Sequence, residues 1–150
     1  MDSLKHKILT YYKQQTADKL DAFRDMVAQL TDGAANDAKG SAGDKHETAL
    51  SMMHLEQEKL NHKIAEFLEQ KSLLDKINPD VSNDRVVVGS LVRANGFHLF
   101  VSTALPKITV DGVSIIALSP QSPLGGMMLG KVVGDTFEVN GTKYLISELF

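Results

Sequence analysis

The 150-residue chain contains no cysteine and no tryptophan, and it has only four prolines. The lack of cysteine excludes a disulfide framework, thiolate zinc sites and thiol catalysis, and it is typical of cytoplasmic proteins. No apolar run approaches the ~20 residues that a membrane-spanning helix needs, and the first residues have no apolar signal core. We therefore expect a cytoplasmic protein with no membrane partner.

A basic excess is also lacking, because the formal net charge is −3 at pH 7. A general nucleic-acid binder needs a clear excess of lysine and arginine, so we expect no direct sequence-specific DNA binding. Residues 84–150 carry five basic and five acidic side chains, out of totals of 16 and 19. Most of the charge thus lies in the first 83 residues, which favours a solvated helical arm beside a compact β-rich domain.

Two apolar repeats with alternating three- and four-residue spacing predict a pair of long helices. The first runs from Leu4 to Leu30, and its seam comprises Thr16, Leu20, Phe23, Val27 and Leu30. The second is expected from about Asp44 to Lys76, and its seam comprises Leu50, Met53, Gln57, Leu60, Ile64, Phe67, Lys71 and Leu74.

The segment between the two repeats predicts a loop. Thr31-Asp32-Gly33 is a typical helix end, since glycine readily adopts the left-handed conformation. Residues 32–43 are small and polar and have almost nothing to bury. A short connection makes the helices antiparallel neighbours, so we expect a helical hairpin over residues 1–77 with its tip at about residues 32–47.

Asp44 and Glu47 lie three residues apart at the expected start of the second helix. This pattern has the form of an N-cap with a carboxylate at the third helical position. Residues three apart in a helix also share a face, so both carboxylates could reach one metal ion. The spacing alone favours a helix cap, and the two roles are compatible.

Residues 78–84 form a predicted linker, because Asn78-Pro79-Asp80 stops the second helix. Beyond it the apolar pattern takes the period of strands. Strands are expected at residues 85–92, 96–102, 107–110, 113–118, 136–139 and 143–147, with a short helix at 124–129. Asn95-Gly96, Asp111-Gly112 and Asn140-Gly141 each predict a tight turn. The expected fold class is therefore α+β, in which an N-terminal antiparallel coiled-coil hairpin precedes a small antiparallel β domain at residues 85–150 with one short helix.

The C-terminal domain contains Leu118-Ser119-Pro120-Gln121-Ser122-Pro123-Leu124-Gly125, followed by Leu129-Gly130-Lys131 and Gly134-Asp135. This order of residues resembles the signature of the bacterial Gre transcript-cleavage factors, GreA and GreB. At the predicted tip, Gly43-Asp44, Glu47 and Ala49 match that family's Gly-Asp-Leu-x-Glu-Asn-Ala pattern. The resemblance covers essentially the whole chain.

The resemblance implies a C-terminal domain like that of FK506-binding proteins. It implies a transcription elongation factor that is not itself an enzyme, binds RNA polymerase and inserts its coiled coil into the secondary channel. There it would stimulate the polymerase to cleave backtracked nascent RNA near the 3′ end. Asp44 and Glu47 would assist magnesium held by the polymerase, with no cofactor bound in isolation. The polymerase-docking loop would comprise Ser119, Pro120, Ser122, Pro123, Leu124 and Gly125.

The tip departs from the family pattern at two positions, where Lys45 replaces an apolar residue and Thr48 replaces asparagine. Lys45 could weaken the negative field of the tip or contact an RNA phosphate. An alternative function is therefore a non-catalytic regulator of the secondary channel, similar to Rnk-type proteins or to an inhibitory Gre paralogue. A coiled-coil scaffold with no link to polymerase is a third hypothesis, and it leaves the C-terminal motif unexplained.

Two further groups of residues are expected to lie on the solvated surface. His46, His54 and His62 are eight residues apart, which is ~12 Å along a helix and too far for one metal ion. The start of the first helix is basic, through Lys5, Lys7, Lys13 and Lys19. We expect a solvated face there, and a contact with polymerase or RNA is the alternative.

Overall fold

The computed structural model describes residues 3–38 and 43–150, and it leaves the side chains of residues 34–47 undescribed. Two long helices come first, α1 (Leu4–Ala38) and α2 (Gly43–Asp75). They are followed by β1 (Leu91–Ala94), β2 (Phe97–Val101), β3 (Ile108–Val110), β4 (Val113–Leu118), α3 (Pro123–Met128), β5 (Thr136–Val139) and β6 (Thr142–Leu149). The expected α+β class is confirmed. No helix in the described ranges combines the length and hydropathy that crossing a bilayer requires.

The chain divides into two compact units. Unit 1 comprises Met1–Lys13 and Ser72–Phe150, and unit 2 comprises Gln14–Lys71. Both long helices contribute to both units, because the start of α1 and the end of α2 belong to unit 1 with the strands. The sequence pattern placed residues 1–77 in the hairpin, whereas packing assigns the ends of that segment to the sheet.

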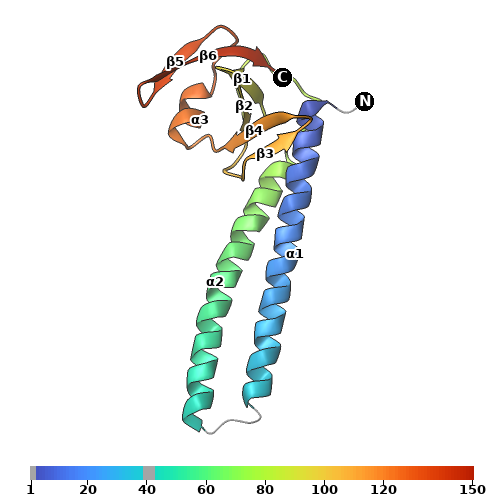
Figure 1. Cartoon of the computed structure of the whole chain (residues 1–150), viewed down its shortest axis with the longest axis vertical. Helices are drawn as coiled ribbons and strands as arrows, with labels where there is room; N and C mark the ends of the chain where they lie inside the picture. Colours follow the sequence, from blue (N-terminus) through green and yellow to red (C-terminus); the bar gives the residue numbers. More distant parts are fainter. Residues whose placement is uncertain (1–2, 39–42) are drawn as a thin grey trace. The chain divides into compact units, whose positions relative to one another are not determined.

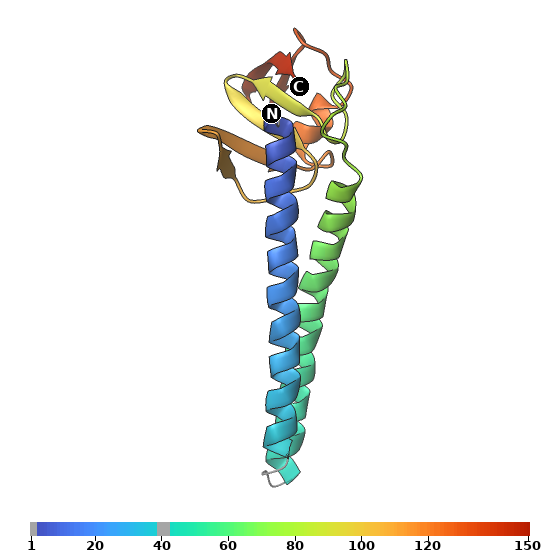
Figure 2. The ribbon, with the colours of Figure 1, turned by 90° about the vertical axis from the view of Figure 1, so that its right-hand side faces the viewer.

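Unit 2 is a hairpin in which α1 and α2 lie side by side in both views (Figure 1 and Figure 2). The predicted seam is confirmed, because Thr16, Leu20 and Phe67 are buried and most other seam residues are partly buried between exposed neighbours. Phe23 packs edge to face on Phe67 with a ring-centroid distance of 5.1 Å. Lys71 is exposed, so its assignment to the seam was wrong.

The first helix ends later than predicted. It continues through Gly33 to Ala38, so residues 32–38 are helical and do not form the predicted loop. Gly33 does not adopt the left-handed backbone that ends helices. Alanines at 34, 35 and 38 have the highest helix propensity, and they offset the cost of the glycine.

Unit 1 is built on a six-stranded sheet with the order β3-β4-β2-β1-β6-β5. The three predicted tight turns are confirmed, because both residues of each turn have positive φ. Most neighbouring strands are antiparallel, but β2 and β4 pair in parallel from His98 with Ile115 to Val101 with Leu118. The prediction of a purely antiparallel sheet was wrong for this pair. The β3–β4 hairpin brings β4 beside β2 in the same direction.

The first strand begins later than predicted, at Leu91 rather than Arg85. A turn precedes it, in which Ser90 N donates to Val87 O at 3.0 Å and Val87 N donates to Ser90 Oγ at 2.9 Å. Gly89 adopts φ +97° within this turn, where a residue with a side chain would be strained. The valine run at 86–88 therefore contains no regular strand.

The sheet buries both of its faces, as the alternation of side chains along a strand allows. One face packs against Ile8, Leu9 and Tyr12 of α1 and Leu74 of α2. The other face packs against Met128 of α3. Neighbours along a strand therefore lie on opposite faces. Leu91 and Phe100 belong to the core beneath α1 and α2, and Val92 and Leu99 belong to the core beneath α3.

Tyr12 joins α1 to the sheet of unit 1. Its ring is fully buried and stacks on Phe100 with a centroid distance of 6.2 Å. Its hydroxyl donates to Pro106 O at 2.8 Å. Burial, with a further contribution from Tyr11, raises the pKa of Tyr12 to about 12. The neutral phenol is thus the form that the folded protein stabilises.

Tyr12→Phe is expected to lower the free energy of unfolding by about 1 kcal/mol, because Pro106 O loses its donor while the ring keeps its packing. Urea denaturation at neutral pH measures the change. Tyr11→Phe is the matched control, since the Tyr11 side chain is 47% exposed, and it should leave stability unchanged. Equal stability of Tyr12→Phe and wild type would contradict the role of this hydroxyl.

Alkaline pH tests the same group by a second route. The folded-state pKa of Tyr12 is raised above its ordinary value of 10.0, so the unfolded chain loses its proton first. Tyr12 therefore contributes fully to stability below about pH 10, and the contribution is lost as pH rises toward about 12. The stability difference between wild type and Tyr12→Phe should shrink across that window in pH-dependent denaturation. A difference that stays constant would contradict the raised pKa.

Candidate functional site

The C-terminal motif forms a capped turn that leads into α3. Ser122 is the N-cap, with extended backbone (φ −69°, ψ 157°), and its Oγ accepts a hydrogen bond from Gly125 N at 3.0 Å. The same hydroxyl donates to Ser119 O at 2.6 Å. Pro123 occupies the first turn of the helix, where its missing N–H costs nothing. The Ser-Pro pair is therefore a helix start with a local physical reason.

Gly125 is required by close packing rather than by backbone conformation. A Cβ at this position would overlap the carbonyl oxygen of Ser119 and would lie 2.9 Å from Ser122 Oγ. Gly125 is buried, so it shapes the loop without presenting a side chain to a partner. Ser119, Pro120, Ser122 and Leu124 are partly buried, and Pro123 is exposed.

The later part of the motif joins the end of α3 to the rest of unit 1. Gly130 N donates to Val86 O at 2.8 Å, and Val86 N donates to Lys131 O at 2.9 Å. Asp135 Oδ2 accepts from Val132 N at 2.9 Å. The Leu-Gly-Lys and Gly-Asp elements thus hold a loop against the segment that precedes β1.

Exposed apolar side chains border this loop. They are Met127, Leu129, Val132 and Val133, with exposed fractions of 45%, 40%, 36% and 54%. The sequence did not indicate that these residues are exposed, because apolar residues beside a short helix are typical of a buried core. Glycines at 130 and 134, which both adopt positive φ, were the available signal that the chain turns repeatedly here.

The predicted tip carboxylates lie in the first turn of α2, which begins at Gly43. The side chains of Asp44 and Glu47 lie outside the described residues, as do those of Lys45 and His46. The expected helix start near Asp44 is confirmed by the backbone. Capping and metal binding by the two carboxylates both remain predictions.

The described part of unit 2 presents charged side chains along the outer faces of both helices. Glu56 pairs with Lys59 at 3.6 Å, and Glu66 pairs with Lys63 at 3.2 Å and with His62 at 3.4 Å. His54 and His62 are exposed, as predicted. Among the described residues, no three histidine, aspartate or glutamate side chains gather closely enough to hold a metal ion.

The basic start of α1 is not the uniform solvated face that the sequence predicted. Lys5 is only 5% exposed, and its Nζ donates to Val81 O at 2.8 Å and to Phe150 O at 3.5 Å. Burial lowers the pKa of Lys5. Val81 of the linker and Phe150 at the end of the chain contact this lysine, which a pattern along one helix cannot reveal.

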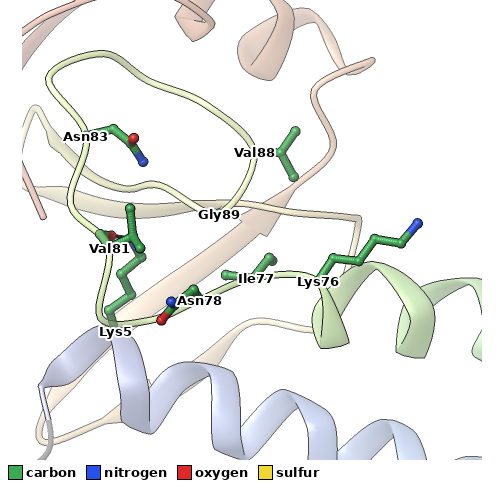
Figure 3. A pocket seen from close by; sticks show the side chains of 8 residues that line it. All are labelled: Lys5, Lys76, Ile77, Asn78, Val81, Asn83, Val88 and Gly89. Carbon is green, nitrogen blue, oxygen red and sulfur yellow. Dashed lines mark hydrogen bonds between the residues drawn. The ribbon is translucent and has the colours of Figure 1, made fainter.

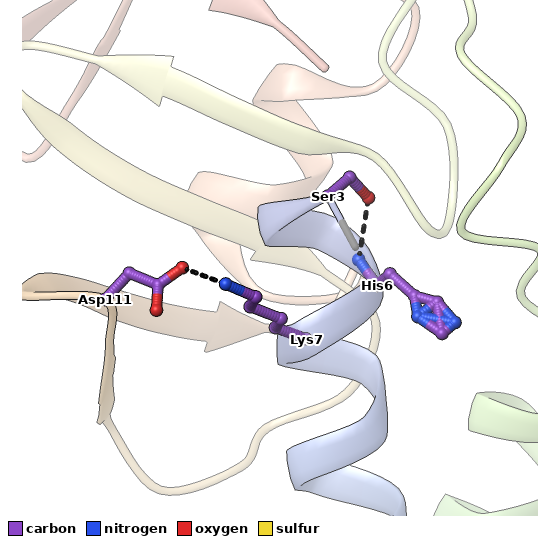
Figure 4. Close-up of polar contacts among 4 residues, drawn as sticks. All are labelled: Ser3, His6, Lys7 and Asp111. Atoms are coloured by element: carbon purple, nitrogen blue, oxygen red, sulfur yellow. Dashed lines mark hydrogen bonds and ion pairs between the residues drawn. The ribbon is translucent and has the colours of Figure 1, made fainter. Parts of the chain in front are cut away.

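Lys7 forms an ion pair with Asp111, 2.8 Å from Nζ to Oδ2 (Figure 4). Both side chains are about half exposed, so the pair contributes little to stability. Asp111 sits in the tight turn between β3 and β4 with φ 52°. Ser3 Oγ accepts from His6 N at 3.1 Å, which satisfies a donor in the first turn of α1. The ion pair connects the start of α1 to the β3–β4 turn within unit 1.

Comparisons with known proteins match this chain to solved structures and to nothing else searched. No family model matches the chain, and no curated protein matches it. A solved structure of the GreA factor homolog 1 (Gfh1) protein of Thermus thermophilus aligns with 92% of this chain and 94% of that chain, at 15% identity and a TM-score of 0.35. A TM-score of this size does not establish a shared fold, so the match assigns no function.

The packing at Gly125 gives a direct test of the capped turn. Gly125→Ala is expected to lower the free energy of unfolding by about 1–3 kcal/mol, because the added methyl group overlaps the Ser119 carbonyl. Gly126→Ala is the matched control in the same helix, since its Cβ would meet Pro120 O at an ordinary 3.4 Å. Thermal denaturation of both variants measures the effect. Equal melting temperatures for the two would contradict the close approach.

Proposed function

We propose that this chain is a Gre-type transcription elongation factor that binds RNA polymerase and stimulates cleavage of backtracked nascent RNA. The observation that carries the proposal is the C-terminal Ser-Pro-x-Ser-Pro-Leu-Gly motif in one chain with a Gly-Asp-x-x-Glu tip. The capped turn at Ser122 and the packing at Gly125 support it, because they give the motif a defined structure in unit 1.

The form of unit 2 also supports the proposal. Residues 14–38 of α1 correspond to about 37 Å of helix at ~1.5 Å per residue. The hairpin packs through one apolar seam, and most of the exposed side chains in its described part are charged or polar, with Met26, Met52, Leu55 and Leu68 exposed among them. A narrow, solvated two-helix arm of this kind suits entry into a water-filled channel lined by a partner.

The chemistry of the tip follows from the start of α2 at Gly43. Aspartate and glutamate offer the oxygen ligands that magnesium prefers, and magnesium sites commonly use one or two carboxylates with water. Magnesium held by the polymerase would supply activation of the attacking water. In this proposal Asp44 and Glu47 add carboxylate oxygens at that centre and orient the water beside the RNA 3′ end.

A second candidate function rests on Lys45, which places a positive charge between the two tip acids in sequence. A positive charge this close reduces the attraction of the tip for a cation. The chain would then occupy the secondary channel and regulate polymerase without stimulating cleavage. Lys45→Leu separates the two functions. If the wild-type chain is a non-catalytic regulator, this variant should gain cleavage activity, and if the wild type already stimulates cleavage, the variant should cleave at a similar rate.

Asp44→Asn and Glu47→Gln are expected to lower the stimulated rate of RNA cleavage by at least about tenfold each. That change corresponds to about 1.4 kcal/mol of lost transition-state stabilisation. Asparagine caps helices as well as aspartate does, so the first variant removes the carboxylate without disfavouring the predicted cap. Cleavage in stalled, backtracked elongation complexes measures the rate.

Polymerase affinity of the same variants, measured by fluorescence anisotropy, should stay within about twofold of wild type, because docking is assigned to unit 1. Glu58→Gln is the matched control, as an exposed acid in the described part of α2, and it should cleave at the wild-type rate. Full cleavage by the Asp44→Asn, Glu47→Gln double variant would overturn the assignment of the tip acids.

A further inference from the structure

A pocket of about 220 Å³ lies within unit 1, where the start of α1 meets the end of α2 and the segment that follows it (Figure 3). Its polar wall consists of Lys5, Lys76, Asn78 and Asn83. Val81 and Val88 provide apolar surface beside them. The pocket is smaller than the 300–1,000 Å³ typical of drug-sized ligands, which points to a small ligand or to one group of a larger molecule.

The side chains that line this pocket carry charge of one sign. Two lysines line it and no acidic side chain does. Only 5% of the surface of Lys5 is exposed. Its two hydrogen-bond acceptors are main-chain oxygens, Val81 O at 2.8 Å and Phe150 O at 3.5 Å. Phe150 is the last residue of the sequence, so its oxygen belongs to a carboxylate that offsets part of the lysine charge.

Lys5 also retains capacity to bind. An ammonium group carries three donors, and the bond to Phe150 O is long at 3.5 Å. The structural role of Lys5, which is to hold the Val81 carbonyl at 2.8 Å, therefore uses one strong bond. At least one N–H is left for a ligand in the pocket that Lys5 lines.

The two asparagines add neutral donors. Asn78 Oδ1 accepts from Asp80 N at 2.9 Å, which commits its oxygen and leaves its NH₂ group to donate. Asn83 is exposed at the other side of the pocket (Figure 3). Lys76 lies at the rim, where its exposed side chain extends away from Lys5 and is able to change rotamer. Ammonium and amide donors around a small concave site are suited to an oxyanion.

We propose that this pocket binds a phosphate group, with Lys5 and Asn78 at its wall and Lys76 and Asn83 closing over it. Phosphate matches the two positive charges and accepts several hydrogen bonds at once. Inorganic phosphate and the terminal phosphate of a monoester share this chemistry. The site lies in unit 1 and does not depend on the function proposed for the tip carboxylates.

Nuclear magnetic resonance of the full ¹⁵N-labelled chain tests the proposal by titration with inorganic phosphate, against chloride at matched ionic strength. Saturable shifts are expected in residues 76–89 and in the side-chain amides of Asn78 and Asn83. A parallel titration with adenosine monophosphate identifies the source. Tighter binding of the monoester indicates a phosphate ester as ligand, and equal or weaker binding indicates free phosphate.

Variants at exposed positions keep the test independent of folding. Asn83→Asp changes one amide into a carboxylate and should abolish binding through repulsion, and Lys76→Gln should weaken it by about tenfold. Lys107→Gln is the matched control, because Lys107 is an exposed lysine of unit 1 outside the pocket. The affinity of this variant for phosphate should stay within about twofold of wild type. Shifts that never saturate, or that persist unchanged in Asn83→Asp, would overturn the proposal.

Discussion

The packing of both helix ends on one face of the sheet is the constraint on which unit 1 depends. Ile8, Leu9 and Tyr12 from α1 and Leu74 from α2 share a core with Leu91 and Phe100. Their burial supplies most of the favourable free energy there, at about 25 cal/mol per Å² of apolar surface. The hydroxyl of Tyr12 is satisfied within this core by Pro106 O. The same packing buries Lys5 and sets the linker around it, so the pocket is a consequence of how the helices end.

Features set by local residue patterns could be predicted from the sequence. The hairpin seam follows from three- and four-residue spacing, and the turns at Asn95, Asp111 and Asn140 follow from the tolerance of asparagine, aspartate and glycine for positive φ. Features set by contacts distant in sequence could not. The parallel pairing of β2 with β4 depends on how the chain returns to the sheet.

The candidate site shows the same division. The motif residues Ser122, Pro123 and Gly125 could be selected from sequence, and the structure adds the reason for each: a cap, a first-turn position and an approach too close for a Cβ. Each of these residues therefore has a role in folding, and the exposed side chains on this loop are Pro123 and neighbours such as Met127 and Val133. The burial of Lys5 had no sequence signal, because lysines at 5, 7 and 13 look alike along one helix.

The functional account joins two parts of the chain that have different physical roles. Unit 1 gives the motif loop a fixed structure, and the start of α2 at Gly43 places two acids in a first helical turn. The motif loop of unit 1 and the two acids of α2 are proposed to act together in stimulating transcript cleavage. The most direct measurement is the rate of RNA shortening in stalled, backtracked elongation complexes with and without the wild-type protein. The account predicts faster shortening in proportion to bound protein, and an unchanged rate at saturating, verified binding would contradict it.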